Sequence, residues 1–239
     1  MKTKRTIKYR HELKLFINFH QYYIIRQRLK NLMQRDDYVG PTGEYHVRSL
    51  YFDDINNTAL AEKLGGVLNR KKYRIRIYNL EDKVIHFEKK IKNNNYIAKF
   101  KESITREMAN NILANDYQEL KSTSKPLLME LYYEMTNKIL RPKVIVDYVR
   151  EPFIHPNGNV RITFDKDLRS GLHSTDLFCR DLNMVRALSE SFIILEVKFD
   201  EFLPNPIRNA LQLGSLHCQA ISKYVICRKF IKLNSWEDQ

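Results

Sequence analysis

A run of eight residues, KKYRIRIY at positions 71–78, limits the possible folds more than any other segment of the chain. Charged and apolar side chains alternate along it, and a period of two residues is that of a β-strand. As a strand, the segment places Lys72, Arg74 and Arg76 on one face, while a tyrosine and two isoleucines point to the other. An ordinary two-faced strand with its cations in bulk water would give the same pattern. One strand alone therefore does not decide what the cations face.

The same alternation returns in five further segments that are typical of strands. Charged or polar residues share one phase in each of them, namely Arg10, Glu12 and Lys14; Glu88, Lys90 and Lys92; Tyr148 and Arg150; Arg161, Thr163 and Asp165; and Glu196 and Lys198. Like charges on neighbouring strands repel, and a solvated face usually balances its charges. A sheet face that carries mostly cations is tolerable where an anion or water fills the space that the side chains face. If the sheet curls into a barrel, that face becomes the lining of a lumen.

A lumen lined by cations has a defined chemistry. It concentrates positive potential and attracts polyphosphate groups. The few carboxylates inside it would supply oxygen ligands, which Mg²⁺ and Mn²⁺ prefer. Arg48 is expected outside this lumen, because it shares the phase of Leu50 and Phe52 rather than that of Ser49 and Tyr51.

The order of predicted elements favours an α+β fold with a largely antiparallel sheet, in a single domain that spans residues 1–239. Turn residues predict a tight connection at 92–95 and a hairpin loop over 152–158. Asn18 is a candidate cap for the first helix. Strands are expected near residues 8–16, 45–53, 71–79, 84–91, 96–101, 143–150, 159–165 and 192–199, and helices near 18–33, 55–65, 105–115, 126–138, 206–213 and 219–230.

The chain is strongly basic, with 41 Lys and Arg against 28 Asp and Glu and a formal net charge of +13. Nucleic acid, an anionic membrane surface, a polyanionic small molecule or merely a solvated basic surface could each account for that charge. The sequence contains no GxxxxGK phosphate loop, no GxGxxG motif and no HxH or HxxxH pair. Three cysteines without CxxC spacing indicate a reducing compartment. With no apolar run long enough to cross a bilayer and no apolar segment after the basic N-terminus, we expect a cytoplasmic protein, with the membrane surface as an alternative location.

Several short stretches together resemble the VTC domain, the polyphosphate polymerase domain of the vacuolar transporter chaperone family, which belongs to the CYTH-like triphosphate tunnel metalloenzymes. They occur in family order and cover nearly the whole chain. The stretches are RHELK at 10–14, VRSLYFD at 47–53, EKLG at 62–65, RKKYRIRIY at 70–78, FEKK at 87–90, LRP at 140–142, RITFD at 161–165, ILEVKFD at 194–200 and SKY at 222–224.

The resemblance implies a closed antiparallel β-barrel tunnel of about eight strands with helices packed outside. It also implies a metal-dependent polymerase that transfers the γ-phosphate of ATP onto a growing inorganic polyphosphate chain, with Mn²⁺ or Mg²⁺ as cofactor. Carried over to this sequence, the catalytic cations are Lys14, Arg74, Arg76, Lys90, Arg150, Arg161 and Lys198, with Glu196 as the metal ligand and Glu12 and Glu88 as weaker metal candidates. The further substrate-binding residues are Arg10, Lys72 and Lys223, the last of them on a C-terminal helix near the tunnel mouth.

The chain departs from the family at Ala220, where many members have a second lysine three residues before Lys223. Three other functions remain open from the sequence. An inorganic triphosphatase would use the same tunnel with water as acceptor, and a non-catalytic module would only bind polyphosphate or inositol phosphates. Nucleic-acid binding is disfavoured, because the strand phases place the cations inside rather than on an exposed surface. A separate membrane protein is a candidate partner, since an anionic membrane surface attracts basic proteins.

Overall fold

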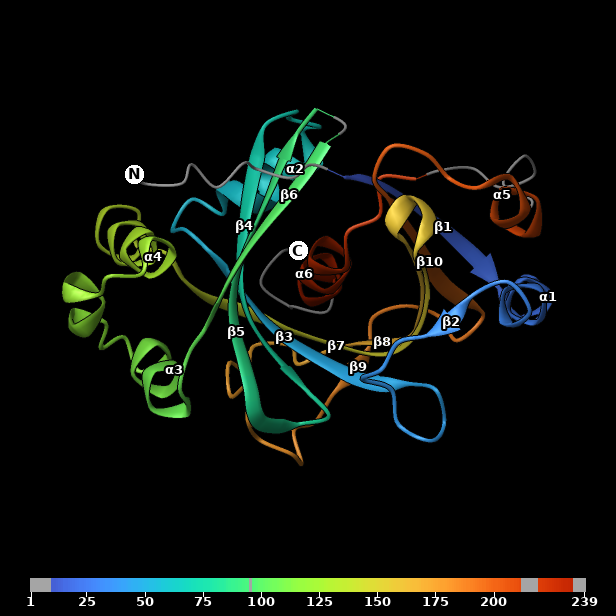
Figure 1. Cartoon of the computed structure of the whole chain (residues 1–239). Coiled ribbons are helices and arrows are strands. Elements are labelled where there is room, and N and C mark those ends of the chain that lie inside the picture. The colour runs from blue at the N-terminus through green and yellow to red at the C-terminus, as the bar shows by residue number, and fades with distance from the viewer. Residues whose placement is uncertain (1–9, 95, 212–218, 234–239) are drawn as a thin grey trace, which may run out of the picture.

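The computed structural model describes residues 10–94, 96–211 and 219–233, and one curled antiparallel sheet dominates it (Figure 1). Eight strands follow one another across the sheet in the order β1-β10-β8-β7-β3-β4-β5-β6, while the two-residue strands β2 and β9 pair with β7 and β8. The strands are β1 (His11–Asn18), β2 (Gln34–Arg35), β3 (Tyr45–Asp53), β4 (Arg70–Tyr78), β5 (Glu81–Asn93), β6 (Tyr96–Ser103), β7 (Arg141–His155), β8 (Val160–Ser170), β9 (Val185–Arg186) and β10 (Phe192–Phe199).

The sheet nearly closes on itself where its two ends, β1 and β6, meet. In the described part of the chain a single bridge joins them, with backbone N···O distances of 3.2 and 3.3 Å between Arg10 and Ile97. The antiparallel tunnel fold is confirmed, but the expectation of a fully closed barrel was too strong. Side chains rather than a continuous ladder span this seam, since Lys90 of β5 reaches Glu12 of β1 at 2.7 Å.

Most helices pack on the convex face of the sheet, as expected. Asn18 caps α1 by accepting a hydrogen bond from the backbone N–H of Gln21, whose side chain accepts one from Asn18 in return. Apolar residues of β1, β8 and β10 pack against α1 and α5, and those of β3, β4 and β5 pack against α3 and α4. These helices are α1 (Phe19–Lys30), α3 (Arg106–Leu113), α4 (Pro126–Asn137) and α5 (Asn205–Leu211), with the short 3₁₀ helix η1 (Gln118–Ser122) before α4.

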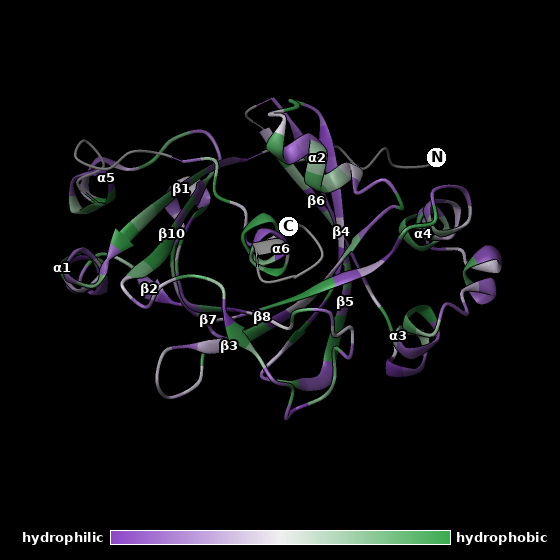
Figure 2. Ribbon diagram, turned by 180° about the vertical axis from the view of Figure 1, so that it is seen from behind, coloured by the Kyte–Doolittle hydropathy of each residue, from purple (hydrophilic) through white to green (hydrophobic). Residues whose placement is uncertain are grey.

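The last helix, α6 (Lys223–Leu233), lies within the curve of the sheet (Figure 1), and Ala59 and Leu60 of α2 (Thr58–Leu64) belong to the same inner apolar cluster. The hydrophobic side of α6 (Figure 2) packs against inward-facing residues such as Val144 and Val146 of β7. These two valines share the phase of Tyr148 and Arg150, so part of the inner face is apolar. The helix therefore fills part of the space that the sheet encloses, and the remainder stays polar.

The predicted elements are confirmed within the described residues, with differences at several boundaries, and residues 8–9 of the first predicted strand lie outside the described residues. Strand β7 continues to His155, so the predicted loop over 152–158 shortens to the 3₁₀ turn η2 (Asn157–Asn159). Helix α6 begins at Lys223 rather than at residue 219, and the predicted helical residues 212–213 lie outside the described residues. Helix α2 (Thr58–Leu64) is shorter than its predicted range. Within the described ranges no helix has the length and apolar character needed to cross a membrane.

Candidate active site

Strand register brings the predicted cations together on the concave face of the sheet. Lys14 of β1 lies directly opposite Glu196 of β10, and Glu12 lies opposite Lys198. Lys198 in turn neighbours Arg161 of β8. Because paired residues of antiparallel strands point to the same face, β1, β10 and β8 present these side chains to one space. The apolar residues between them point outward into the core under α1 and α5.

Glu196 is the centre of the ionic cluster in this space. Its carboxylate accepts hydrogen bonds from Lys14 and Lys223 at 2.8 Å and from Lys198 at 3.0 Å. Arg150 Nη2 lies 3.4 Å from its Oε2 atom, and the residue is 4% exposed. Burial raises the pKa of Glu196, but the surrounding cations outweigh it and hold the pKa well below its usual range. The carboxylate is therefore ionised throughout the neutral range.

Asp165, which was predicted to face inward but was not assigned to the site, is a member of this cluster. Arg150 binds its carboxylate through two hydrogen bonds of 2.6 and 2.7 Å, and Lys223 Nζ lies 2.5 Å from Oδ2. Its phase, which it shares with Arg161 and Thr163, was the signal that could have found it. Lys223 was expected near the tunnel mouth, but it lies 6% exposed between Asp165 and Glu196, because α6 enters the concave side of the sheet.

Glu12 links the central cluster to the seam between the two ends of the sheet. Lys90 donates to both of its oxygens at 2.7 and 2.9 Å, and Lys198 Nζ lies 3.4 Å away. Burial raises the pKa of Glu12, but Lys14, Lys90 and Lys198 outweigh it and lower the pKa. Burial, together with Lys14 and Lys198, lowers the pKa of Lys90 to about 8 against the opposing effect of Glu12.

A second carboxylate position lies on β5, apart from the first. Glu88 accepts hydrogen bonds from Arg74 at 2.6 and 2.7 Å, and Lys99 Nζ of β6 lies 2.5 Å away. Arg74 also donates to the Tyr51 hydroxyl at 2.7 Å. Burial raises the pKa of Tyr51, but Arg74 and Arg76 outweigh it and lower the pKa. The three predicted metal-ligand glutamates therefore do not form one group, since Glu88 is held by its own cations.

Arg76 is buried without a carboxylate partner among the described residues. Its guanidinium donates to the Ser49 hydroxyl at 3.0 Å and to the Tyr148 hydroxyl at 3.1 Å, and the residue is 5% exposed. Glu88 favours the charged form of Arg76 from beyond ion-pair distance and Arg74 opposes it, and a buried cation without a direct ion pair is costly. The arrangement fits a site whose counter-charge arrives with a ligand.

Three predicted site residues lie at the margins of the cluster. Arg161 is directed inward, but it binds Asp36 and the Tyr45 hydroxyl, the latter at 3.1 Å. Arg10 forms an ion pair with Asp200 at 2.8 Å, at the end of the sheet beyond the central carboxylates. Lys72 donates to the Ser222 hydroxyl at 3.0 Å, just before α6.

The oxygen donors of the central cluster fit a divalent cation that is shared with a phosphate ligand. Glu12 and Glu196 are both ionised and are joined through Lys14 and Lys198, and the buried Thr163 hydroxyl beside Glu196 has no hydrogen-bond partner among the described residues. No group of three or more His, Cys, Asp or Glu side chains in the described ranges is arranged to hold a metal by itself. One or two carboxylates with phosphate oxygens are the usual ligands of protein-bound Mg²⁺.

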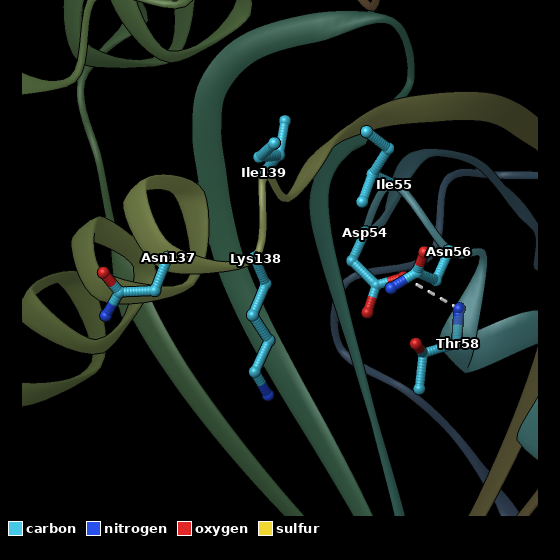
Figure 3. Close-up of a pocket in the computed structure, with 7 residues that line it drawn as sticks. All are labelled: Asp54, Ile55, Asn56, Thr58, Asn137, Lys138 and Ile139. Atoms are coloured by element: carbon cyan, nitrogen blue, oxygen red, sulfur yellow. Dashed lines mark hydrogen bonds between the residues drawn. The ribbon is translucent and has the colours of Figure 1, made fainter.

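A pocket of about 330 Å³ lies elsewhere, between the segment after β3 and the end of α4 (Figure 3). Asp54 closes one side of it and accepts a hydrogen bond of 2.9 Å from the backbone N–H of Thr58. Its one lysine, Lys138, is half exposed and pairs with Glu134 at 3.5 Å. The pocket contains none of the predicted site cations and is not a polyanion site. Its lining residues are Asp54, Ile55, Asn56, Thr58, Asn137, Lys138 and Ile139.

Several solved structures, among them the following three, are similar to this chain. A Hippeastrum protein, HpAC1, reported to have a dominant triphosphatase activity, is 13% identical over 92% of this chain and 95% of its own, with a TM-score of 0.55. An adenylate cyclase candidate from Bacillus halodurans is 11% identical over 87% and 89%, with a TM-score of 0.49. The capping enzyme triphosphatase of Mimivirus is 12% identical over 94% and 91%, with a TM-score of 0.42. The likeness to the Hippeastrum protein shows a shared triphosphate tunnel fold.

A comparison with curated proteins gives no match. The family model for the VTC domain, in contrast, matches residues 9–232, which include all strands of the sheet and nearly all of α6. The resemblance found in the sequence is thus confirmed, and the chain belongs to the VTC domain family.

Proposed function

We propose that this protein is a metal-dependent polyphosphate polymerase, which transfers the γ-phosphate of ATP onto a growing inorganic polyphosphate chain inside the tunnel. The observation that carries the proposal is the convergence of inward-facing cations that outnumber the carboxylates among them. Arg76 supports it most sharply, because this buried guanidinium has only hydroxyl partners among the described residues. Membership of the VTC domain family supports the same function.

The cations would bind and orient the triphosphate of ATP. Arg74 and Arg76 project from β4 at alternate positions on one face, so their guanidinium groups can hold successive phosphates. Phosphoryl transfer depends mainly on positioning and on neutralisation of charge, which fixed cations in a poorly hydrated site supply. Lys14 and Lys198, which now bind carboxylates, can turn to phosphate oxygens when the substrate enters.

Glu196 and Glu12 would hold Mn²⁺ or Mg²⁺ together with phosphate oxygens, and the bound ion would supply Lewis-acid polarisation of the γ-phosphate. The acceptor is the terminal phosphate of the chain. It is already anionic and nucleophilic, so the site needs no strong general base. Arg150 keeps Glu196 in place by bridging it to Asp165.

The second candidate function is an inorganic triphosphatase on the same tunnel, with water as acceptor. The Hippeastrum protein of the same fold, reported to have a dominant triphosphatase activity, favours this alternative. The two reactions share the donor site and differ only in the group that attacks the γ-phosphorus.

Incubation of the purified protein with ATP and Mn²⁺ tests the proposal directly. We expect ADP together with a polymer that stains as polyphosphate on a gel. Orthophosphate released from ATP or tripolyphosphate without polymer would replace the proposal with the triphosphatase. Tight binding of tripolyphosphate with no consumption of either nucleotide or tripolyphosphate would indicate a binding module.

A further inference from the structure

A second group of cations lies at the end of the tunnel beside α2, and we call it the mouth cluster. Its members are Lys63 on α2, Arg70 and Lys72 at the start of β4, and Lys92 near the end of β5. Helix α2 packs against β4 and lies beside the ends of β4 and β6 (Figure 1). Arg70 is directly opposite Lys92 in the strand register, and Lys72 is directly opposite Lys90.

Like charges directly opposite on neighbouring strands destabilise a sheet, and carboxylates normally offset them. In the described residues, no member of the mouth cluster forms an ion pair with a carboxylate. Lys72 instead donates to the Ser222 hydroxyl and lies 4.9 Å from the centre of the Tyr224 ring, and Arg70 donates to a backbone carbonyl. Glu62 and Glu12 favour the charged forms of Arg70 and Lys92 only from beyond ion-pair distance. The cluster thus lacks the direct counter-ions that Glu196 and Asp165 provide deeper in the tunnel.

The lowered pKa of Lys63 agrees with this geometry. Its partial burial lowers its pKa to about 8, and Arg70, Lys92 and Lys14 add to the effect. The pKa of Lys72 is also lowered well below its usual range, by burial and then by Lys14 and Lys90. Both ammonium groups would regain their charge fully beside a bound polyanion.

The mouth cluster is continuous with the candidate active site. Lys72 lies opposite Lys90, which binds Glu12. The charge of Lys14 in the central cluster contributes to the lowered pKa values of both Lys63 and Lys72. One ligand that reaches both regions must carry charges at close intervals along a thin, flexible chain. Condensed phosphate has this form, whereas a nucleic acid strand also needs room for its bases.

We propose that the mouth cluster binds the distal phosphates of a linear polyphosphate chain, and that the tunnel thereby prefers chains longer than a triphosphate. The inference rests on the proposed function, because the same chain must occupy the central site. It assigns Lys63, Arg70 and Lys92 to substrate length selection, in addition to Lys72.

The test compares two double variants of equal net charge. Lys63→Gln with Lys92→Gln removes two cations of the mouth cluster. Lys83→Gln with Lys121→Gln removes two exposed lysines outside the tunnel. Isothermal titration calorimetry, without metal or nucleotide, gives the affinity of each protein for tripolyphosphate and for a longer linear polyphosphate. We expect the mouth variant to lose about tenfold more affinity for the long chain than for tripolyphosphate, since only the long chain spans both regions.

The control variant should leave the ratio of the two affinities unchanged, and Lys92→Gln alone should give a smaller change in the same direction. Equal losses for both ligands, or no loss for the long chain, would overturn the inference. So would an equal loss for a single-stranded oligonucleotide, which would indicate a general polyanion surface. Because the assay needs no turnover, an inactive protein would refute the proposed function while still measuring this ratio.

Discussion

The centre and the mouth of the tunnel differ in how their cations are neutralised. At the centre, Arg150 and Lys223 bind Asp165 and Glu196 in a buried, fully paired network. At the mouth, Lys63 and Lys72 have neutral or cationic neighbours among the described residues. The paired network can hold its shape without a ligand, whereas the lysines of the mouth gain a direct counter-ion only when an anionic ligand binds. Replacing a cation of the centre with a neutral side chain should therefore lower the free energy of unfolding, and replacing a lysine of the mouth should raise it.

The largest effect is expected from Glu196→Gln, which removes the central carboxylate charge. Turnover should fall by about 100-fold or more, because electrostatic positioning and the metal ligand are lost together. Metal-free binding of tripolyphosphate should not weaken, since the site becomes more positive. Steady-state kinetics and calorimetry measure the two quantities.

Glu44→Gln is the matched control for that variant, because Glu44 binds Lys166 away from the central cluster. It should leave turnover within about twofold of the wild type. Retained metal-dependent turnover in the Glu196 variant would contradict its assigned role.

Arg150→Met tests the paired network through stability. The change leaves Asp165 and Glu196 with one cation fewer in a buried site, and breaking a buried pair costs about 3–5 kcal/mol. Urea denaturation should show a lower free energy of unfolding with an unchanged denaturant slope. A loss below about 1 kcal/mol, the range of exposed ion pairs, would mean that the network is solvated.

Lys72→Met tests the mouth in the opposite sense. Removing an ammonium that lacks a carboxylate partner should raise the free energy of unfolding by about 1 kcal/mol, while long-chain polyphosphate binds more weakly. The same denaturation experiment measures the change. Destabilisation comparable to that of the Arg150 variant would erase the distinction between the two regions.

The pH dependence of polyphosphate binding should reveal the lysines whose pKa values are lowered. The pKa values of Lys63 and Lys90 are lowered to about 8, and a bound polyanion favours their protonated forms. Binding should therefore take up protons near pH 8, and affinity should fall as the pH rises through that value. Calorimetry in two buffers of different ionisation enthalpy measures the uptake. Binding heats that do not depend on the buffer would exclude it.

Strand phase alone predicted most of the inner face. Arg74, Arg76 and Glu196 lie where the alternation placed them, and Arg48 lies outside, where it binds Asp147 at 2.8 Å. A period of two fixes the face of each side chain once one face is buried, so these assignments needed no tertiary information.

The position of α6 on the concave side of the sheet could not be predicted from the sequence. Its apolar residues fit either a convex or a concave surface, and only the inward valines of β7 decide between the two. The family resemblance placed Lys223 near the tunnel mouth instead of at the centre. The separation of Glu88 from Glu196 was also hidden, because strand phase gives the face of a residue but not its distance from residues on non-neighbouring strands.

A crystal structure with bound tripolyphosphate tests the central claim most directly, namely that the strand cations converge on one enclosed anion site. The account predicts phosphate oxygens within hydrogen-bond distance of Arg74, Arg76 and Lys14, on the concave side of the sheet. Tripolyphosphate bound only on the convex side, with Arg76 still contacting nothing but its two hydroxyls, would contradict it.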